Sequence, residues 1–517
     1  MTRILPAGDA ALAVELGDRI DPEIAARVRD LDGALRARPF DGFLESVPTY
    51  RSLLVLFDPE RVGADAAAEA LRETAATAPA VVTESRVHDV PVVYGGAAGP
   101  DFDAVAAAAR ISPAELIALH TGTEYTAFML GFTPGFAYLG QLDERLGLPR
   151  RATPRERVAA GSVAIANRQT AIYPAASAGG WHLLGRTALR LFDPSREKPA
   201  LIVPGDRVRF RAVDALPTPA VVETSPVTGT PVVEVLESGL LTTVQDAGRR
   251  GYRRLGVGSS GAIDLEALVR ANRAVGNPPG AAALECTLAG PALRFLSPLR
   301  FAITGADLGA HLERADLGAW PVPAGVAVQA RPGNVLRFTG RRSGCRAMLA
   351  MAGGIDVPLV LGSRATDLLG GFGGHEGRAL RPGDLLAALP ARNSAEQSSP
   401  EPWSDAEAAT VRVVGGPQHE PNALAELVGS EWEVAPGSDR VALRLRGPRI
   451  RLSGPAEIVS DGMVPGSIQV PPDGQPIVML RDSPTTGGYP KIATLLSADL
   501  DRLAQLVPGA ARVRFSA

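Results

Sequence analysis

The sequence predicts a mainly β protein with an α+β domain at its N-terminus. Over most of the chain, short runs rich in β-branched residues alternate with turns made of proline, glycine and aspartate, as in strands joined by tight loops. A Pro-Gly turn followed by an alternating strand occurs at 204–210, 332–338 and 508–515. Residues 1–85, in contrast, combine helical and strand periodicity.

A longer pattern occurs twice and supports the same fold class. Residues 161–181 begin GSVAI and end GGW, and residues 466–489 begin GSIQV and end GGY, with a Gln and an apolar strand between. Each copy is followed by one of the Pro-Gly strands. Because the order of the parts is kept, we expect one β unit to be used several times.

Composition narrows the functional classes. A chain of 517 residues predicts roughly three to four domains. A net charge of −3 without a basic block argues against nucleic acid as a partner. Two cysteines, Cys286 and Cys345, cannot form a disulfide framework, and the spacing of a zinc site is absent. The N-terminus does not resemble a signal peptide and no apolar run could span a membrane, so we expect a soluble cytoplasmic protein without a membrane partner.

Residues 1–85 are expected to form the small α/β domain. Helical spacing of apolar residues covers 22–38, a strand pattern covers 47–57, and a second helical pattern covers 64–76. Its sequence shows no obvious catalytic or ligand-binding motif.

Residues 86–215 are expected to form the first β-barrel domain. It contains a helix at 112–120, with Ser112 as N-cap and Glu115 completing a capping box. Residues 125–140 interrupt an aromatic run with glycines, which fits either a bulged core strand or the wall of a ligand site. The candidate substrate-binding residues here are Phe132, Phe136, Tyr138, Arg155, Gln169, Tyr173, Trp181 and Arg186.

Residues 216–230 have the composition of a linker, and 231–391 are expected to form the next β domain. The GVGSSG stretch at 256–261 matches a dinucleotide-binding pattern, but the preceding residues do not form a buried parallel strand, so we reject that interpretation. Some polar residues here are expected to be caps, such as Asp264 before the following helix. The candidate site residues are Gln245, Asp246, Arg249, Asp264, Asn272, Glu285 and Asp367, with Asp246 as a catalytic candidate.

Residues 392–408 form a second expected linker, and 409–517 the last domain, which carries the strongest candidate segment, 460–491. Lysine occurs only at Lys198 and Lys491 among 53 basic residues, so an ammonium kept at 491 points to a need for a compact charge or a removable proton. The catalytic candidates here are Lys491, Asp482 and Tyr489. The substrate-binding candidates are Asp461, Gln469, Gln475, Thr485 and Thr486.

Several common catalytic motifs are absent from the sequence. The chain has no GxxxxGK[ST] phosphate loop, no GxSxG elbow and no HExxH zinc motif. It also has no Met-Lys-Met biotin attachment site.

Specific motifs resemble a known pair of families. GFTPGFAYLG at 131–140, together with GSVAIANRQTAIYP and AGGWHLLGRT, resembles the B component of 5-oxoprolinase, also called the KipI or allophanate hydrolase subunit 1 family. LLTTVQDAGRRGYRRLG, SRATDLLGGFGG and SIQVPPDGQPIVMLRDSPTTGGYPKI resemble the C component, the KipA or allophanate hydrolase subunit 2 family, which is carboxyltransferase-like. The resemblance covers nearly the whole chain in order and implies a natural fusion of B and C.

The resemblance implies cyclophilin-like β-barrels in tandem, one in the B-like half and two in the C-like half. It also implies ATP-dependent hydrolysis of 5-oxo-L-proline to L-glutamate, with ATP and Mg²⁺, together with a separate partner protein, the A component, of the LamB/YcsF family. The metal ligands are unknown, and we expect a homo-oligomer. Two alternatives stay open: the carboxyltransferase component of a biotin-dependent urea carboxylase, and a KipI-like regulator of a histidine kinase.

Overall fold

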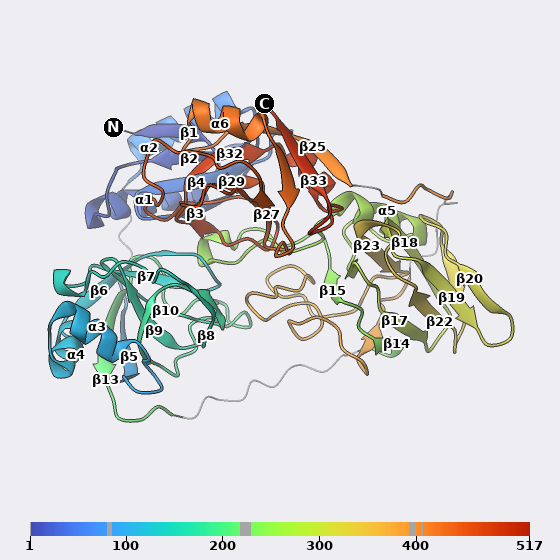
Figure 1. The fold of residues 1–517 in the computed structure, drawn as a ribbon, viewed down its shortest axis with the longest axis horizontal. Helices are drawn as coiled ribbons and strands as arrows, with labels where there is room; N and C mark the ends of the chain where they lie inside the picture. Colours follow the sequence, from blue (N-terminus) through green and yellow to red (C-terminus); the bar gives the residue numbers. More distant parts are fainter. Residues whose placement is uncertain (1, 80–84, 218–228, 392–398, 405–406) are drawn as a thin grey trace.

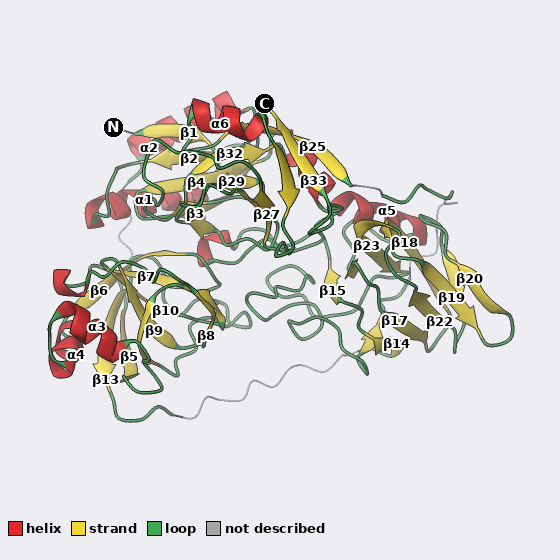
Figure 2. Ribbon diagram, viewed as in Figure 1, coloured by secondary structure: helices red, strands yellow, loops and turns green. Residues whose placement is uncertain are grey.

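The protein is mainly β, as the sequence predicts. A computed structural model shows 35% strand and 16% helix. The N-terminal domain and the C-terminal barrel lie together, the first barrel lies below them, and a two-sheet unit lies to the right (Figure 1). Figure 2 shows that helices are few and peripheral. The residues that the structure describes are 2–79, 85–217, 229–391, 399–404 and 407–517.

The N-terminal domain is a four-stranded antiparallel sheet with two helices. Its sheet order is β1-β2-β4-β3. The elements are β1 (Arg3–Pro6), β2 (Ala11–Glu15), α1 (Pro22–Ala37), β3 (Phe43–Pro48), β4 (Ser52–Phe57) and α2 (Ala64–Thr77). Both predicted helices are confirmed, but the single strand predicted at 47–57 is wrong. Thr49 donates a hydrogen bond to the carbonyl of Ser52 (2.9 Å) and accepts one from its N–H (3.3 Å), which turns the chain into a hairpin.

The first barrel is closed and has the strand order β10-β7-β6-β13-β5-β12-β9. Its strands are β5 (Val87–Tyr94), β6 (Glu124–Leu130), β7 (Ala137–Gly140), β9 (Ser162–Ala166), β10 (Gln169–Ile172), β12 (His182–Arg186) and β13 (Arg207–Ala212). Its other elements are α3 (Phe102–Ala109), α4 (Pro113–Thr121), and a two-stranded sheet of β8 (Arg155–Val158) and β11 (Ser177–Gly179). Ser112 caps α4 as predicted, whereas the carboxylate of Glu115 pairs with Arg145 instead of completing a capping box.

The C-terminal barrel is also closed, with the order β25-β32-β29-β30-β27-β26-β33. Its strands are β25 (Ala408–Gly415), β26 (Glu431–Val434), β27 (Ala442–Arg446), β29 (Ser467–Gln469), β30 (Ile477–Met479), β32 (Lys491–Leu495) and β33 (Arg512–Ser516). Its other elements are α6 (Pro421–Val428), α7 (Leu500–Leu503), and a two-stranded sheet of β28 (Asp461–Gly462) and β31 (Thr486–Gly487).

The two barrels share one topology, which confirms the predicted repeat. Beginning at β5 the first barrel runs β5-β12-β9-β10-β7-β6-β13, and beginning at β25 the second runs β25-β32-β29-β30-β27-β26-β33. In each, the strand after the Pro-Gly turn closes the barrel by pairing in parallel with the first strand. The two copies of the longer sequence pattern therefore occupy equivalent strand pairs, β9–β10 and β29–β30.

The middle unit departs from the expected closed barrel. It has a six-stranded sheet, β20-β19-β22-β17-β14-β24, and a five-stranded sheet, β15-β16-β23-β18-β21, which share one apolar core. Its elements are β14 (Pro231–Glu237), β15 (Leu241–Gln245), α5 (Leu265–Val275), β16 (Ala283–Thr287), β17 (Ala292–Phe295), β18 (Leu299–Asp307), β19 (Ala310–Arg314), β20 (Gly318–Pro321), β21 (Val328–Ala330), β22 (Val335–Phe338), β23 (Ser343–Met351) and β24 (Leu385–Ala387). The Pro-Gly strand β22 pairs antiparallel with both of its neighbours, so it does not close a barrel. The two expected linkers lie largely outside the described residues.

The N-terminal domain and the C-terminal barrel are joined although they are far apart in the sequence. The carboxylate of Asp9 accepts hydrogen bonds from the N–H and hydroxyl of Ser497. Gly462 in β28 lies against β4, and a Cβ at this position would come within 2.6 Å of Leu54 Cβ. Figure 1 shows the blue N-terminal sheet beside the red C-terminal strands. The B-like and C-like halves are therefore interlocked.

Candidate active site

Buried polar atoms without partners gather at one end of the C-terminal barrel. Within the described part of the chain, five side chains here each have a buried nitrogen or oxygen atom that makes no hydrogen bond. We call these residues the Lys491 cluster: Asp461, Gln469, Thr485, Thr486 and Lys491. Unpaired buried polar atoms cost free energy, so such a concentration indicates a site that a polar ligand completes.

Strand pairing brings the members of the cluster together. Gln469 of β29 pairs with Lys491 of β32, and Asp461 of β28 pairs with Gly487 of β31. Gly487 lets the amide of Gln469 approach the backbone, since an added Cβ would lie 2.2 Å from its Nε2 and would displace it. Thr485 belongs to the same loop and its carbonyl accepts the N–H of Met463.

The ammonium of Lys491 is buried, at 1% exposure, and its Nζ has no hydrogen-bond partner among the described residues. Burial lowers the pKa of Lys491, and the Asp461 carboxylate opposes this shift. The more distant Arg51 and Glu15 of the N-terminal domain act on the same pKa in opposite directions. Lys491 therefore holds its proton less tightly than an ordinary lysine, as an acid–base group requires.

Two other units cover the cluster. Oδ1 of Asp461 accepts a short hydrogen bond from the hydroxyl of Ser52 in the N-terminal domain, while its Oδ2 stays unpaired. From the first barrel, Gly131 lies against Thr486: a Cβ at Gly131 would come within 2.1 Å of Oγ1 of Thr486. The first barrel and the 461–491 segment, both of which carry predicted site residues, are thus in direct contact.

Gly131→Ala should disturb the site through this contact. The neighbouring atom belongs to a β-branched side chain with few rotamers, so we expect a loss of about 1–3 kcal/mol in unfolding free energy and a displaced Thr486 hydroxyl. Thermal unfolding and a crystal structure of the variant would check this. Gly63→Ala is the matched control, because nothing lies within 4 Å of an added Cβ at Gly63. Equal stability of both variants would contradict the close contact.

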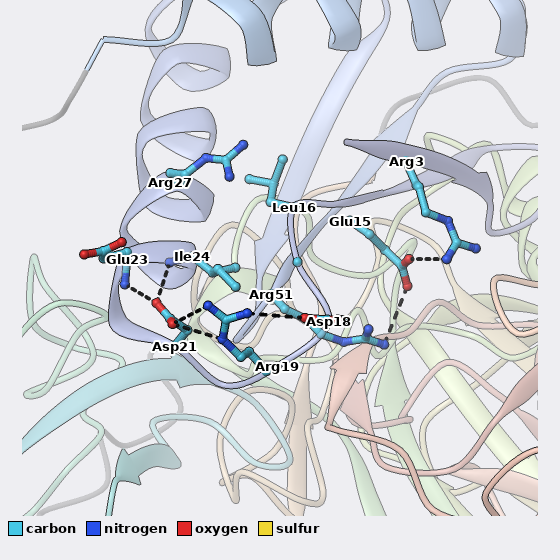
Figure 3. Close-up of a pocket in the computed structure, with 11 residues that line it drawn as sticks. Arg3, Glu15, Leu16, Asp18, Arg19, Asp21, Glu23, Ile24, Arg27 and Arg51 are labelled. Atoms are coloured by element: carbon cyan, nitrogen blue, oxygen red, sulfur yellow. Dashed lines mark hydrogen bonds and ion pairs between the residues drawn. The ribbon is translucent and has the colours of Figure 1, made fainter. Parts of the chain in front are cut away.

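A cavity of about 530 Å³ opens in the N-terminal domain (Figure 3). Its lining includes Glu15 and Arg51, whose charges act on Lys491. Glu15 lies between Arg3 and Arg51, at 3.6 Å from a guanidinium nitrogen of each (Figure 3). Arg19 lies between Asp18 and Asp21 in the same view. The long distances around Glu15 leave both arginines able to take a further anionic partner.

The candidates Asp482, Glu285 and Asp264 form a separate network. Arg440 binds both oxygens of Asp482 (2.8 and 3.0 Å) and makes a short bond to Glu285. Asp264 caps α5 through the N–H of Ala267 (2.8 Å), as predicted, and accepts Nε2 of Gln505 (2.6 Å). These bonds join the middle unit to the C-terminal barrel. The carboxylates therefore have partners within this network, and the catalytic role of Asp482 stays a prediction.

The candidates Asp246, Gln245, Arg249 and Asp367 hold the loop at 361–377. Asp246 accepts bonds from Gly248 N–H (2.7 Å), the Ser363 hydroxyl (2.7 Å) and Arg364 N–H (2.6 Å), so its carboxylate is satisfied within this loop system. Arg249 donates to the carbonyl of Ala365 (2.6 Å), but its Nε and Nη1 have no hydrogen-bond partner in the described structure. Oε1 of Gln245 is also unpaired there.

Asp367 gives this loop an unusual pH dependence. Burial raises its pKa from 3.8 to about 6, against the opposing charge of Arg249. Between about pH 4 and pH 6 the folded state therefore holds a proton that the unfolded chain has lost, so the contribution of Asp367 to stability falls as pH rises through this window. In Asp367→Asn this dependence should disappear.

Denaturation midpoints of wild type and Asp367→Asn, measured from pH 4 to pH 7, would test this. Asp384→Asn is the control with opposite sign: burial would raise the pKa of Asp384, but Arg378, the backbone N–H of Arg381 and the charge of His375 together outweigh burial and lower it. Parallel pH curves for wild type and Asp367→Asn would contradict the prediction.

The aromatic candidates pack on one another. Phe136 makes edge-to-face contacts with four other rings, at centroid distances from 4.9 to 5.9 Å. The five rings are those of Phe132, Phe136, Tyr138, Tyr173 and Trp181. For Phe132, Phe136 and Tyr138 these contacts favour the packed core, whereas Phe128 and Gly140 of the same run line a cavity. Tyr138 lies at its edge, near Thr486 and Ser460.

Most of the remaining candidates bind groups outside the Lys491 cluster. Arg155 donates to Asp101 (2.7 Å), and Arg186 donates to the carbonyl of Ala160. Asn272 binds the carbonyls of the 279–281 turn, and Gln475 bridges the backbone of Gly447. Tyr489 is half-buried beside the cluster, and Gln169 lines a second cavity.

Sequence reasoning missed several residues that the structure brings to the site. Thr49 and Ser52 lie within the single strand predicted at 47–57. The polar sequence Thr-Tyr-Arg-Ser at 49–52 could have indicated a turn at this point. No local pattern marks Arg440 or Gln505. Among the described residues, no group of three or more His, Cys, Asp or Glu side chains is arranged to hold a metal ion, and no helix has the length and apolar character needed to cross a bilayer.

Comparison with known proteins matches both parts of the chain. Residues 2–202 match the model "Carboxyltransferase domain, subdomain C and D", and residues 255–517 match "Carboxyltransferase domain, subdomain A and B". The crystal structure of TTHA0988 superposes with a TM-score of 0.86 at 35% identity and covers 100% of both chains.

Curated relatives divide along the same boundary. The B component of 5-oxoprolinase from Escherichia coli O157:H7 is 43% identical over 204 residues, which are 39% of this chain and 92% of that protein. The C component of 5-oxoprolinase from Escherichia coli K12 is 39% identical over 284 residues, 54% of this chain and 89% of that protein. Urea amidolyase of Lachancea kluyveri is 34% identical over 305 residues, 53% of this chain but 16% of that protein. The chain therefore belongs to the carboxyltransferase domain family, as a fusion of a half homologous to the B component of 5-oxoprolinase with a half homologous to its C component.

Proposed function

We propose that this chain is the B/C component of an ATP-dependent 5-oxoprolinase, which activates 5-oxo-L-proline for hydrolysis to L-glutamate with a separate A component. The observation that carries the proposal is the Lys491 cluster of the C-terminal barrel, a buried set of unpaired acid, amide, hydroxyl and ammonium groups that two other units cover. The relatives of both halves support the same assignment.

The chemistry explains why such a cluster is needed. A lactam carbon is a poor electrophile, so the γ-phosphoryl group of ATP is transferred to the amide oxygen, which breaks the β,γ-anhydride bond and releases ADP. Water then adds to the ring carbon, the C–N bond opens as nitrogen takes a proton, and a second water releases phosphate. Charge develops on oxygen first and on nitrogen later.

Lys491 and Asp461 suit these two steps. The ammonium of Lys491 is fixed in a dry site, where it stabilises charge on the amide oxygen and phosphoryl group more strongly than it would in water. Because its pKa is lowered, Lys491 can then give its proton to the ring nitrogen. Asp461 offers its unpaired Oδ2 to orient either the ammonium or the attacking water.

The cavity of the N-terminal domain, which both arginines and acids line, has two arginines that suit the nucleotide phosphates. Arg3 and Arg51 lie on either side of Glu15 and are held only loosely, so both can turn toward phosphate oxygens. Mg²⁺ would arrive with ATP as part of the substrate. Phosphate oxygens and water would supply most ligands of such a Mg²⁺. One carboxylate, such as that of Glu15, would then be enough as a ligand from the protein.

ATP turnover by this chain with an A-component protein tests the function. We expect ADP release that depends on 5-oxo-L-proline and yields L-glutamate. The urea amidolyase relative favours carboxyl transfer to urea as the second candidate. Turnover that depends on urea and a biotin carrier, and that avidin blocks, would establish that alternative. Folded proteins without any oxoproline-dependent turnover would overturn the leading proposal.

A further inference from the structure

A second cavity, of about 410 Å³, lies where three units meet. Ile20 and Tyr50 of the N-terminal domain form one side, Phe128 and other residues of the first barrel form another, and the segment 457–460 of the C-terminal part forms the third. Its volume lies in the range of small-molecule sites. Both homologous halves therefore contribute walls to one cavity.

Tyr50 supplies this cavity with an unsatisfied donor. Its side chain has no exposure, and its hydroxyl has no hydrogen-bond partner within the described chain although the residue lines the cavity. The ring packs against Phe128 at 5.3 Å, which fixes its direction. Burial raises the pKa of Tyr50 well above its ordinary value, so the phenol keeps its proton and can donate.

Arg150 supplies a cation beside Tyr50. Its Nε is buried and unpaired, and its ion pair is with the half-exposed Glu457, at 4.0 Å. Arg150 and Tyr50 line the same cavity, and the charge of Arg150 lowers the pKa of both Tyr50 and Tyr138 against the larger, raising effect of burial. An arginine whose ion pair is long and a phenol without a hydrogen-bond partner, in one cavity, form a receptor for a carboxylate.

The lining of the cavity also includes an amide and an apolar surface. Within the described residues the side chain of Gln169 makes no hydrogen bond, so it presents both a donor and an acceptor to the cavity. This pair is complementary to the N–H and C=O of another amide. Phe128 and Val459 cover the apolar part of the lining.

The cavity adjoins the Lys491 cluster. Ser460 lines it and directly precedes Asp461. The guanidinium of Arg150 packs against the backbone of the 485–491 loop, since a Cβ at Gly488 would lie 3.3 Å from its Nη2. A molecule in the cavity is therefore beside the groups that the proposed chemistry uses.

We propose that this cavity binds the lactam substrate, a small cyclic amide that carries a carboxylate, and this assignment rests on the proposed function. Arg150 and Tyr50 hold the carboxylate. Gln169 pairs with the amide edge, and the ring lies between Phe128 and Val459. The carboxylate thus selects the substrate, while the Lys491 cluster performs the chemistry.

Titration calorimetry of the full chain by itself, without nucleotide or the A component, tests the assignment. We expect 5-oxo-L-proline to bind at least about tenfold more tightly than 2-pyrrolidinone, which lacks the carboxylate, because a charged hydrogen-bonded contact is lost. Arg150→Met should abolish this preference, and Tyr50→Phe should weaken 5-oxo-L-proline binding about five- to tenfold. Arg145→Met is the control, because Arg145 pairs with Asp143 and Glu115 and does not line the cavity.

The outcomes separate this assignment from the proposed function. Oxoproline hydrolysis with an unchanged KM in Arg150→Met and Tyr50→Phe would overturn the assignment and leave the function intact. Binding that is lost in Arg150→Met, in a system that shows no oxoproline-dependent turnover, would support the cavity's ligand class and remove the function. A wild-type chain that binds 5-oxo-L-proline no better than 2-pyrrolidinone would overturn the assignment.

Discussion

Replacement of Lys491 by methionine should lower 5-oxo-L-proline-dependent ATP turnover at least about a hundredfold, because one fixed charge-stabilising group is lost. Methionine keeps the unbranched apolar stem, so the barrel stays filled. The lost ammonium is buried without a hydrogen bond, and burial already lowers its pKa. The unfolding midpoint should therefore stay the same or rise, which separates a role in chemistry from one in folding.

The chain contains its own control for this experiment. Lys198 is the other lysine and is exposed in the loop before β13. Lys198→Met should leave turnover and stability unchanged. An acylating reagent should also distinguish the two lysines, because the lowered pKa of Lys491 increases its reactive neutral fraction when the site is open. Full activity in Lys491→Met would remove Lys491 from the mechanism.

The barrel topology could be predicted because it has a local cause. The turn-strand pattern of residues 161–181 is repeated at 466–489, and the structure places both copies on equivalent strand pairs. Local turn chemistry and alternation specify such a hairpin wherever it occurs. The same local pattern at 332–338 does not determine how many strands its neighbours form, which is why the middle unit departs from a closed barrel.

The site could be predicted only in part, because most of its contacts join residues that are far apart in the sequence. Lys491 and Asp461 lie on one segment, and the contrast between one retained ammonium and many arginines marked it. The bond from Ser52 to Asp461 joins residues 409 positions apart, and Arg440 lies 155 positions from Glu285. No spacing rule reports such contacts. Asp482 and Asp246 were therefore candidates by residue type alone, and the structure shows both carboxylates engaged in hydrogen-bond networks.

Replacement of Arg440 by methionine should destabilise the interface between the middle unit and the C-terminal barrel by about 3–5 kcal/mol. Arg440 is 3% exposed and binds two carboxylates, of Glu285 and Asp482, which are 1% and 6% exposed. Without the guanidinium, Asp482 remains buried and loses its ion pair, while Glu285 keeps only the N–H of Ile263 (2.8 Å) and the distant guanidinium of Arg346 (3.9 Å). Urea denaturation followed by the fluorescence of Trp432, which is buried in this barrel, would report the change.

The control for Arg440 is an arginine of the same barrel whose partner is solvated. Arg512 is 63% exposed and pairs with Glu431 at 2.8 Å, so Arg512→Met should cost no more than about 1 kcal/mol. Adding Asp482→Asn to Arg440→Met should recover part of the stability, since one unpaired charge is removed. If the double variant is no more stable than Arg440→Met, repulsion between buried carboxylates is not the cause. Arg440 holds Asp482, which precedes the loop that carries Thr485 and Thr486. Arg440→Met should therefore also weaken turnover, because the Lys491 cluster is misplaced.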